Sequence, residues 1–113
     1  MNEKVILHGA SVHPGGKALI VDGTVASEAT DQAASRKVYF PLSQCRVNED
    51  GEYQCPQWLA RAKAGDAVYQ WVSSRGAKGI DHLGGAGLTA SFAGATYYVD
   101  LGDLRKAERY ANR

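Results

Sequence analysis

The chain has 113 residues, the length of one domain, and we expect a single domain over residues 1–113. Its net charge of +1 excludes the strongly basic composition that is typical of dedicated nucleic-acid-binding domains. Residues 1–60 hold 5 Lys/Arg against 7 Asp/Glu, a net −2, and residues 61–113 hold 8 against 5, a net +3. This imbalance predicts at most a modest basic patch on the second half.

The N-terminal residues do not form a signal peptide, because an acidic residue stands at position 3 and the apolar run is too short. No stretch approaches the roughly 18 consecutive apolar residues of a membrane span. We therefore expect a cytoplasmic protein that makes no contact with a membrane. Its cysteines are then reduced by default.

The first third of the chain has the pattern of strands joined by turns. Apolar, β-prone residues predict a strand over residues 4–12, and a second strand follows the HPGG turn at residues 18–21. Asp22-Gly23 is typical of a hairpin turn, which would pair the residues after it back onto this second strand. The polar segment 27–36 fits a loop or a short helix equally well.

Residues 37–47 give the clearest strand pattern. Val38, Phe40 and Leu42 alternate with other residues, so that one face is apolar. Pro41 cannot donate to a β-ladder, which predicts an edge strand or a bulge at this position.

A hairpin is expected next, at the NEDGE sequence. Gly51 suits the left-handed position that ends a three-residue loop. This register pairs Arg46 with Gln54 and places Cys45 opposite Cys55, at a non-hydrogen-bonded pair of the two strands.

The second half should contain helices. Pro56 fits a first helical position, Trp58 and Leu59 belong to an apolar face, and Gly65 is expected to end this helix. Residues 66–74 fit a strand or a second helix, and we favour the helix.

The C-terminal third begins with a glycine-rich loop over residues 76–87. Two short strands should follow, separated by Ala93-Gly94, and then a helix with Asp103 as its N-cap. The elements together predict an α+β fold, with a small twisted antiparallel sheet or partial barrel and two or three packed helices. The expected core residues are Val38, Phe40, Leu42, Ile20, Trp58, Leu59 and Leu104.

Neither a metal site nor a cofactor site is predicted. Zinc would need four ligands, and His8, His13 and His82 are scattered along the chain without ligand spacing. For Cys45 and Cys55 we favour two half-buried thiols packed under the hairpin over a cross-strand disulfide.

No catalytic group stands out either. Asp81 and His82 lie beside the glycine-rich loop, but adjacent side chains of an extended segment point apart and are not a dyad. No Ser or Cys lies in a nucleophile motif. We therefore expect a protein that is not an enzyme.

Aromatic and basic residues together suggest a binding face. Stacking of bases on aromatic rings inside a cationic groove is how proteins hold single-stranded nucleic acid, although aromatic residues also fill cores. The candidate binding residues are Tyr39, Tyr53, Arg46, Arg61, Lys63, Tyr69, Arg75 and Lys78.

Residues 37–64 resemble small accessory proteins of phages and prophages. These proteins carry a P-x-S-Q motif followed by P-x-W-L-A-x-x-K. The matching residues here are Pro41, Ser43, Gln44, Pro56, Trp58, Leu59, Ala60 and Lys63. The match covers about a quarter of the chain and implies no catalytic residues. It implies an accessory factor, often encoded near single-strand-binding or recombination functions, in which Trp58 and Leu59 dock a helix onto a strand.

Two functions follow from these patterns. The first is a phage-type accessory protein that binds a host protein in the host cytoplasm, including inhibition of a defence complex in the manner of an anti-CRISPR protein. The second is a single-stranded DNA-binding accessory of phage replication or recombination. A homodimer through an edge strand, either the Pro41 strand or residues 95–99, is a further expectation.

Overall fold

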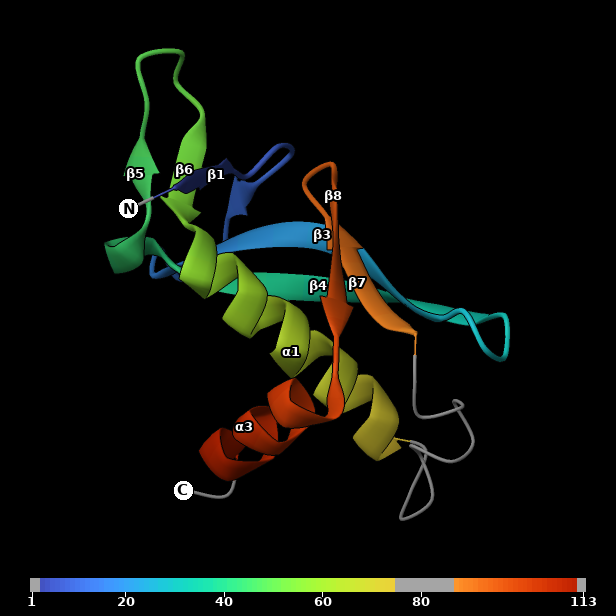
Figure 1. Cartoon of the computed structure of the whole chain (residues 1–113). Helices are drawn as coiled ribbons and strands as arrows, with labels where there is room; N and C mark the ends of the chain where they lie inside the picture. The colour runs from blue at the N-terminus through green and yellow to red at the C-terminus, as the bar shows by residue number, and fades with distance from the viewer. Residues whose placement is uncertain (1–2, 75–86, 112–113) are drawn as a thin grey trace.

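The computed structural model describes residues 3–74 and 87–111, and it has an α+β architecture (Figure 1). The described part contains two helices and two antiparallel sheets, of three and five strands. The predicted fold class is confirmed, and the sheet does not close into a barrel. In chain order the elements are β1 (Lys4–Ile6), β2 (Ser11–Val12), β3 (Ala18–Ser27), β4 (Gln32–Pro41), a 3₁₀ turn (Leu42–Gln44), β5 (Arg46–Val47), β6 (Tyr53–Pro56), α1 (Gln57–Ser74), β7 (Leu88–Phe92), β8 (Ala95–Val99) and α3 (Leu101–Ala111).

The larger sheet is built around β3. Strand β4 pairs with the whole length of β3 on one side, and β2 and β7 share its other side. β8 pairs with β7 and is an edge of the sheet, and β4 is the opposite edge. Pro41 ends β4, so the prediction that its strand is an edge strand is confirmed.

Gly23 lies inside β3 and not in a turn, so the predicted Asp22-Gly23 hairpin is wrong. A Cβ at this position would lie 2.9 Å from the carbonyl oxygen of Ser91 and 3.3 Å from the Cβ of Phe92. The glycine is therefore explained by the close approach of β7 to β3, which is a known use of glycine within strands. β3 turns back only after Ser27, and residues 28–31 form a turn that leads into β4.

The smaller sheet has the predicted hairpin. Arg46 pairs with Gln54, and Gly51 has a φ of +77°, as the three-residue loop requires. β1 pairs with the other side of β6 and places Val5 opposite Cys55. The predicted strand over residues 4–12 is in fact two short strands, β1 and β2, one in each sheet.

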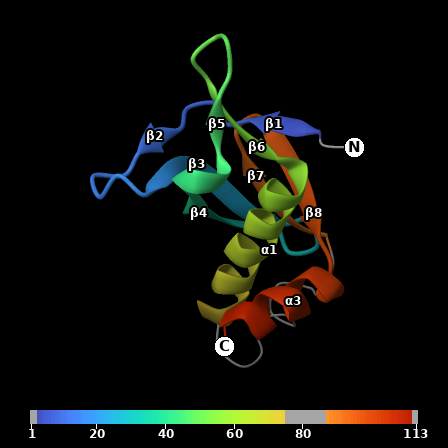
Figure 2. The ribbon, with the colours of Figure 1, turned by 90° about the vertical axis from the view of Figure 1, so that its left-hand side faces the viewer.

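α1 continues through Gly65 to Ser74, so the predicted helix end at Gly65 is wrong and the helix favoured for residues 66–74 is confirmed. α1 lies across the inner face of the larger sheet and contacts both sheets, and α3 packs against α1 (Figure 2). Gly65 is buried where the two helices meet, and a Cβ there would lie 3.7 Å from the carbonyl oxygen of Asp103. Gly65 is thus explained by the close packing of α1 against α3, and it does not end the helix.

α3 begins three residues earlier than predicted, at Leu101. The side chain of Asp100 accepts a hydrogen bond from the Asp103 N–H (2.9 Å), and the Asp103 side chain accepts one from the Asp100 N–H (3.1 Å). Asp100 is therefore the N-cap, and Asp103 completes a reciprocal capping arrangement in the first turn. The hydrogen bond from the Asp103 N–H, and Lys106 nearby, hold the pKa of Asp100 below its usual value.

The core between α1 and the larger sheet contains most of the residues expected there. Val38, Phe40, Leu59 and Leu104 are buried, and Leu42 and Ile20 are half-buried. Trp58 is the exception, since 62% of it is exposed. In the described part of the chain, no helix is both long and apolar enough to span a membrane.

Candidate protein-binding groove

The two most exposed large apolar side chains of the described residues belong to one groove. Trp58 is 62% exposed and Tyr98 is 63% exposed, and both line a hollow between α1, β8 and α3. We call it the Trp58 groove. Its lining residues are Trp58, Arg61, Ala62, Gly65, Asp66, Tyr97, Tyr98, Asp103, Lys106 and Ala107.

The position of Trp58 follows from the periodicity of α1. Trp58, Arg61, Ala62 and Gly65 are spaced as i, i+3, i+4 and i+7, so they form one stripe along the helix. The core stripe lies elsewhere on the helix and consists of Ala60, Ala64, Ala67, Val68 and Trp71. Ala62 and Gly65 carry little or no side chain, which leaves the groove open beside the indole ring.

The charges of the groove leave two cations without an ion-pair partner. Among the described residues, neither Arg61 nor Lys106 forms an ion pair. The two carboxylates of the groove are engaged instead. Asp66 lies 3.9 Å from the Lys63 amine, and Asp103 accepts the capping bond at the start of α3. The groove therefore offers an aromatic ring beside two cations that form no ion pair within the described chain.

Tyr97 and Tyr98 form the β8 wall of the groove and point to opposite faces of the sheet. Tyr97 is buried and stacks on Phe92 with the ring centroids 5.0 Å apart, and burial raises its pKa. The Tyr98 hydroxyl donates a 3.0 Å hydrogen bond to Glu28 near the end of β3. This bond raises the pKa of Tyr98, so both tyrosines are neutral at physiological pH.

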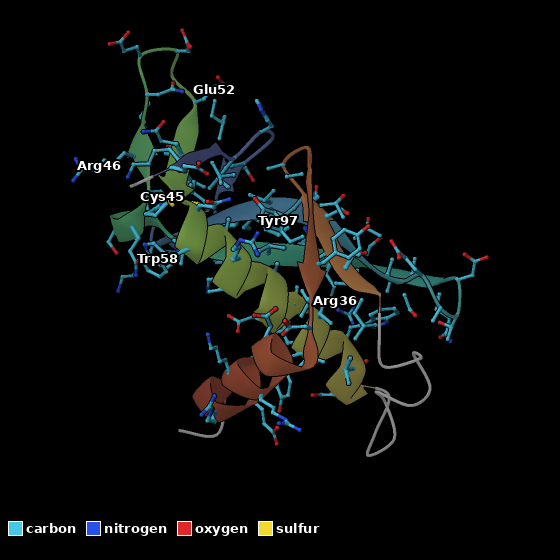
Figure 3. All side chains as sticks on the ribbon, viewed as in Figure 1. Arg36, Cys45, Arg46, Glu52, Trp58 and Tyr97 are labelled. Carbon is cyan, nitrogen blue, oxygen red and sulfur yellow. The ribbon has the colours of Figure 1, made fainter. Side chains whose placement is uncertain are left out.

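The predicted binding residues do not form one face. Arg61 lies in the Trp58 groove, whereas Tyr39 is 47% exposed on the outer face of β4. Tyr53 and Arg46 belong to the smaller sheet, on β6 and β5. Figure 3 shows Arg46 and Trp58 apart from Arg36, which lies on the larger sheet.

Lys63 and Tyr69 lie on α1, both half-buried. Lys63 shares a small hollow of about 140 Å³ with Tyr39, and Tyr69 packs against the core. Arg75 and Lys78 lie outside the described residues, as do Asp81 and His82. The structure thus brings Tyr39 close to Lys63 and leaves the remaining described members of the set dispersed.

A larger hollow of about 670 Å³ lies on the five-stranded sheet, on the side that α1 does not cover. Its lining combines small residues of neighbouring strands with three charged residues, Asp22, Arg36 and Lys37. The one aromatic residue of its lining, Phe92, is buried. The lining of this hollow lacks an exposed aromatic anchor such as Trp58, so we favour the Trp58 groove as the binding site.

The cysteines are thiols in the structure, as expected from the sequence. Cys55 is buried, and Cys45 is half-buried with its thiol donating to the Pro41 carbonyl oxygen (3.4 Å). Burial raises the pKa of Cys55 to about 11, and the nearby Cys45 adds to this shift. Across residues 3–74 and 87–111, no three His, Cys, Asp or Glu side chains gather closely enough to hold a metal ion.

Comparisons with known proteins find no matching family model, no matching curated protein and no matching solved structure.

Sequence reasoning missed the groove because it placed Trp58 in the core. Once the helix is extended past Gly65, the core stripe through Ala60, Ala64, Ala67 and Trp71 becomes visible in the sequence. Trp58 stands two positions before Ala60, about 200° away around a helix, and so belongs to the exposed side. A single helix over residues 57–74 would have predicted that Trp58 is exposed.

Proposed function

We propose that this chain is a non-catalytic binding protein that docks a partner protein through the Trp58 groove. The observation that carries the proposal is the exposure of the large apolar Trp58 ring beside Arg61 in one groove. Trp, Tyr and Arg are the residues that most often dominate the binding energy of protein interfaces.

The size of the groove favours a side chain of a protein over a free small molecule. Its volume is about 270 Å³, below the roughly 300–1,000 Å³ of typical small-molecule sites. The resemblance of residues 37–64 to phage accessory proteins favours a host protein as the partner, including a subunit of a defence complex. In that case the chain acts by occupying a surface that the host complex needs.

A capture experiment with matched variants tests this proposal. Tagged wild-type chain, Trp58→Ala and Tyr39→Ala are used to capture proteins from a host-cell lysate. Both substitutions truncate an exposed aromatic residue, so both variants should fold. We expect the partner to be captured by the wild type and by Tyr39→Ala and to be lost with Trp58→Ala. Equal capture by Trp58→Ala would show that the groove is not the docking site.

Binding of single-stranded DNA is the competing function, and it has a distinct signature. Such binding weakens steeply with salt and is abolished by reversing the charges of its cations, here Arg61→Glu with Lys63→Glu. We expect labelled single- and double-stranded oligonucleotides to show no change in fluorescence anisotropy with the wild-type chain at physiological salt. Retained binding that the double variant abolishes would replace the protein-binding proposal with the nucleic-acid one.

A further inference from the structure

The free edge of β8 lies beside the Trp58 groove. β8 is the last strand of the larger sheet, and Tyr97 and Tyr98 at this edge line the groove. In Figure 1, β8 crosses in front of β3 and β4 and leads down into α3. The edge and the groove are therefore parts of one continuous surface.

The register of the β7–β8 hairpin fixes which backbone groups face outward. Phe92 and Ala95 flank a two-residue turn, in which Ala93 has a φ of +54° and Gly94 a φ of +80°. Positive φ values at both positions are those of a type I′ turn, whose flanking pair is hydrogen-bonded.

Pairs along an antiparallel ladder alternate between hydrogen-bonded and non-hydrogen-bonded. Thr96 and Tyr98 are consequently in non-hydrogen-bonded pairs, with Ser91 and Thr89, and direct their N–H and C=O groups away from β7. Outside the strand ladders, no backbone hydrogen bond among the described residues involves Thr96 or Tyr98.

β8 also lacks the features that keep edge strands from pairing. Its sequence, ATYYV, has no charged residue and no proline. The opposite edge of the sheet, β4, carries Arg36, Lys37 and Pro41, which are the usual protections of an exposed edge. Of the two edges, β8 is the one that is open to an added strand.

Resting on the function proposed above, we propose that the partner docks by adding an extended segment as a strand to β8. Alternate residues of an added strand point to the same face of the sheet. Those on the inner face would enter the Trp58 groove, while the partner backbone pairs with Thr96 and Tyr98. Recognition by strand addition takes affinity from main-chain bonds and specificity from such pockets.

The charged residues of the Trp58 groove indicate which side chains the partner's added segment should carry. Arg61 and Lys106 lack ion-pair partners among the described residues, so an acidic residue of the segment is favoured next to an apolar one on the same face. A second copy of this chain fits less well, because it would bring the same two cations to the interface. The occupant is thus an extended segment of a different protein, with an apolar and an acidic residue two positions apart.

The test compares two substitutions at one position. Thr96→Pro removes the outward N–H, and proline is tolerated at an edge strand where that N–H faces solvent. Thr96→Val keeps the N–H, and both variants lose the same 2.9 Å contact between the hydroxyls of Thr96 and Ser91. The probe is a phage-displayed library of random dodecapeptides, selected on the immobilised full chain.

We expect the selected peptides to alternate β-prone residues and to carry the apolar and acidic pair. Their affinity should be similar for wild type and Thr96→Val and at least about tenfold lower for Thr96→Pro, which loses a main-chain bond and gains a proline ring at the contact. If circular dichroism shows that Thr96→Pro does not fold, hydrogen exchange of the wild-type amides is measured in place of the affinity of that variant. Bound peptide should then slow exchange of the Thr96 and Tyr98 amides at least about tenfold.

Other outcomes overturn the proposal. Peptides that bind Thr96→Pro as well as wild type but lose binding to Trp58→Ala would exclude strand addition and leave the groove as the docking site. Peptides that are indifferent to both substitutions would overturn the strand addition and the proposed function together. Failure to select any peptide, or dimerisation of the wild type that Thr96→Pro abolishes, would also contradict a foreign extended segment as the occupant.

Discussion

At the scale of single residues, a few positions combine a residue type with a backbone conformation or an environment that is unfavourable for it. Ala93 is the clearest of these, because a residue with a Cβ occupies the first position of the type I′ turn, with a φ of +54°. Residues other than glycine, asparagine and aspartate rarely adopt this conformation. The β7–β8 hairpin forms despite this cost because its strands are held by β3 on one side and by α1 above.

Ala93→Asn should therefore stabilise the protein. Asparagine tolerates the left-handed conformation, and Asn-Gly is the preferred sequence of this turn, so we expect a gain of about 1 kcal/mol in the free energy of unfolding. Urea denaturation followed by circular dichroism measures it. Ala95→Asn, which introduces the same side chain on the strand, is the control and should not stabilise. An unchanged midpoint for Ala93→Asn would show that the turn is not strained.

Cys55 makes a pH-dependent contribution to stability. Its folded-state pKa of about 11 is above its ordinary value of 9.0, so its contribution is complete below pH 9 and is lost as the pH rises towards 11. We expect the free energy of unfolding to fall less steeply between pH 9 and 11 in Cys55→Ala than in wild type. Equal slopes would contradict the burial of this thiol.

The same difference in burial predicts the order of thiol modification at neutral pH. Cys45 is half-buried and should react with a disulfide reagent before the buried Cys55. Unfolded protein, in which both thiols react together, is the control. Faster modification of Cys55 than of Cys45 in the folded protein would contradict this assignment.

At the scale of elements, local signals predicted the hairpins well and the long elements badly. The two hairpins around Gly51 and Ala93-Gly94 could be predicted from the sequence, because the residues that favour a turn lie within the turn itself. From Gly23 we predicted a turn and from Gly65 the end of a helix, and neither is present. Each glycine instead allows close contact with a residue that is distant in sequence. Ser91 approaches Gly23, and Asp103 approaches Gly65, and neither contact is visible without the fold.

These two glycines should respond oppositely to alanine. At Gly65 a Cβ would be in ordinary contact, so Gly65→Ala should stabilise α1 by up to about 1 kcal/mol through helix propensity. At Gly23 it would meet the Ser91 carbonyl oxygen at 2.9 Å, and Gly23→Ala should destabilise by about 1–3 kcal/mol. Thermal denaturation of both variants checks this. Stabilisation by Gly23→Ala would contradict the close approach of β3 and β7.

At the scale of the whole molecule, α1 joins the two sheets and presents Trp58 at the groove beside β8 and α3. The sequence was sufficient for the α+β class and for most of the core. The binding site needed the fold, because its walls come from α1 and from the β8–α3 segment, which are far apart along the chain. The predicted platform assumed that aromatic and basic residues would share a face, and the register places Tyr39 and Tyr53 in different sheets.

The central claim, that the Trp58 groove is a protein-docking surface, is tested most directly by site-specific photocrosslinking. The photoreactive residue p-benzoylphenylalanine replaces Trp58 in one variant and Tyr39 in a matched control, and both are irradiated in host-cell lysate. We predict a discrete covalent adduct with one protein from position 58 and none from position 39. The absence of a protein adduct at position 58, or the same adduct from both positions, would contradict the claim.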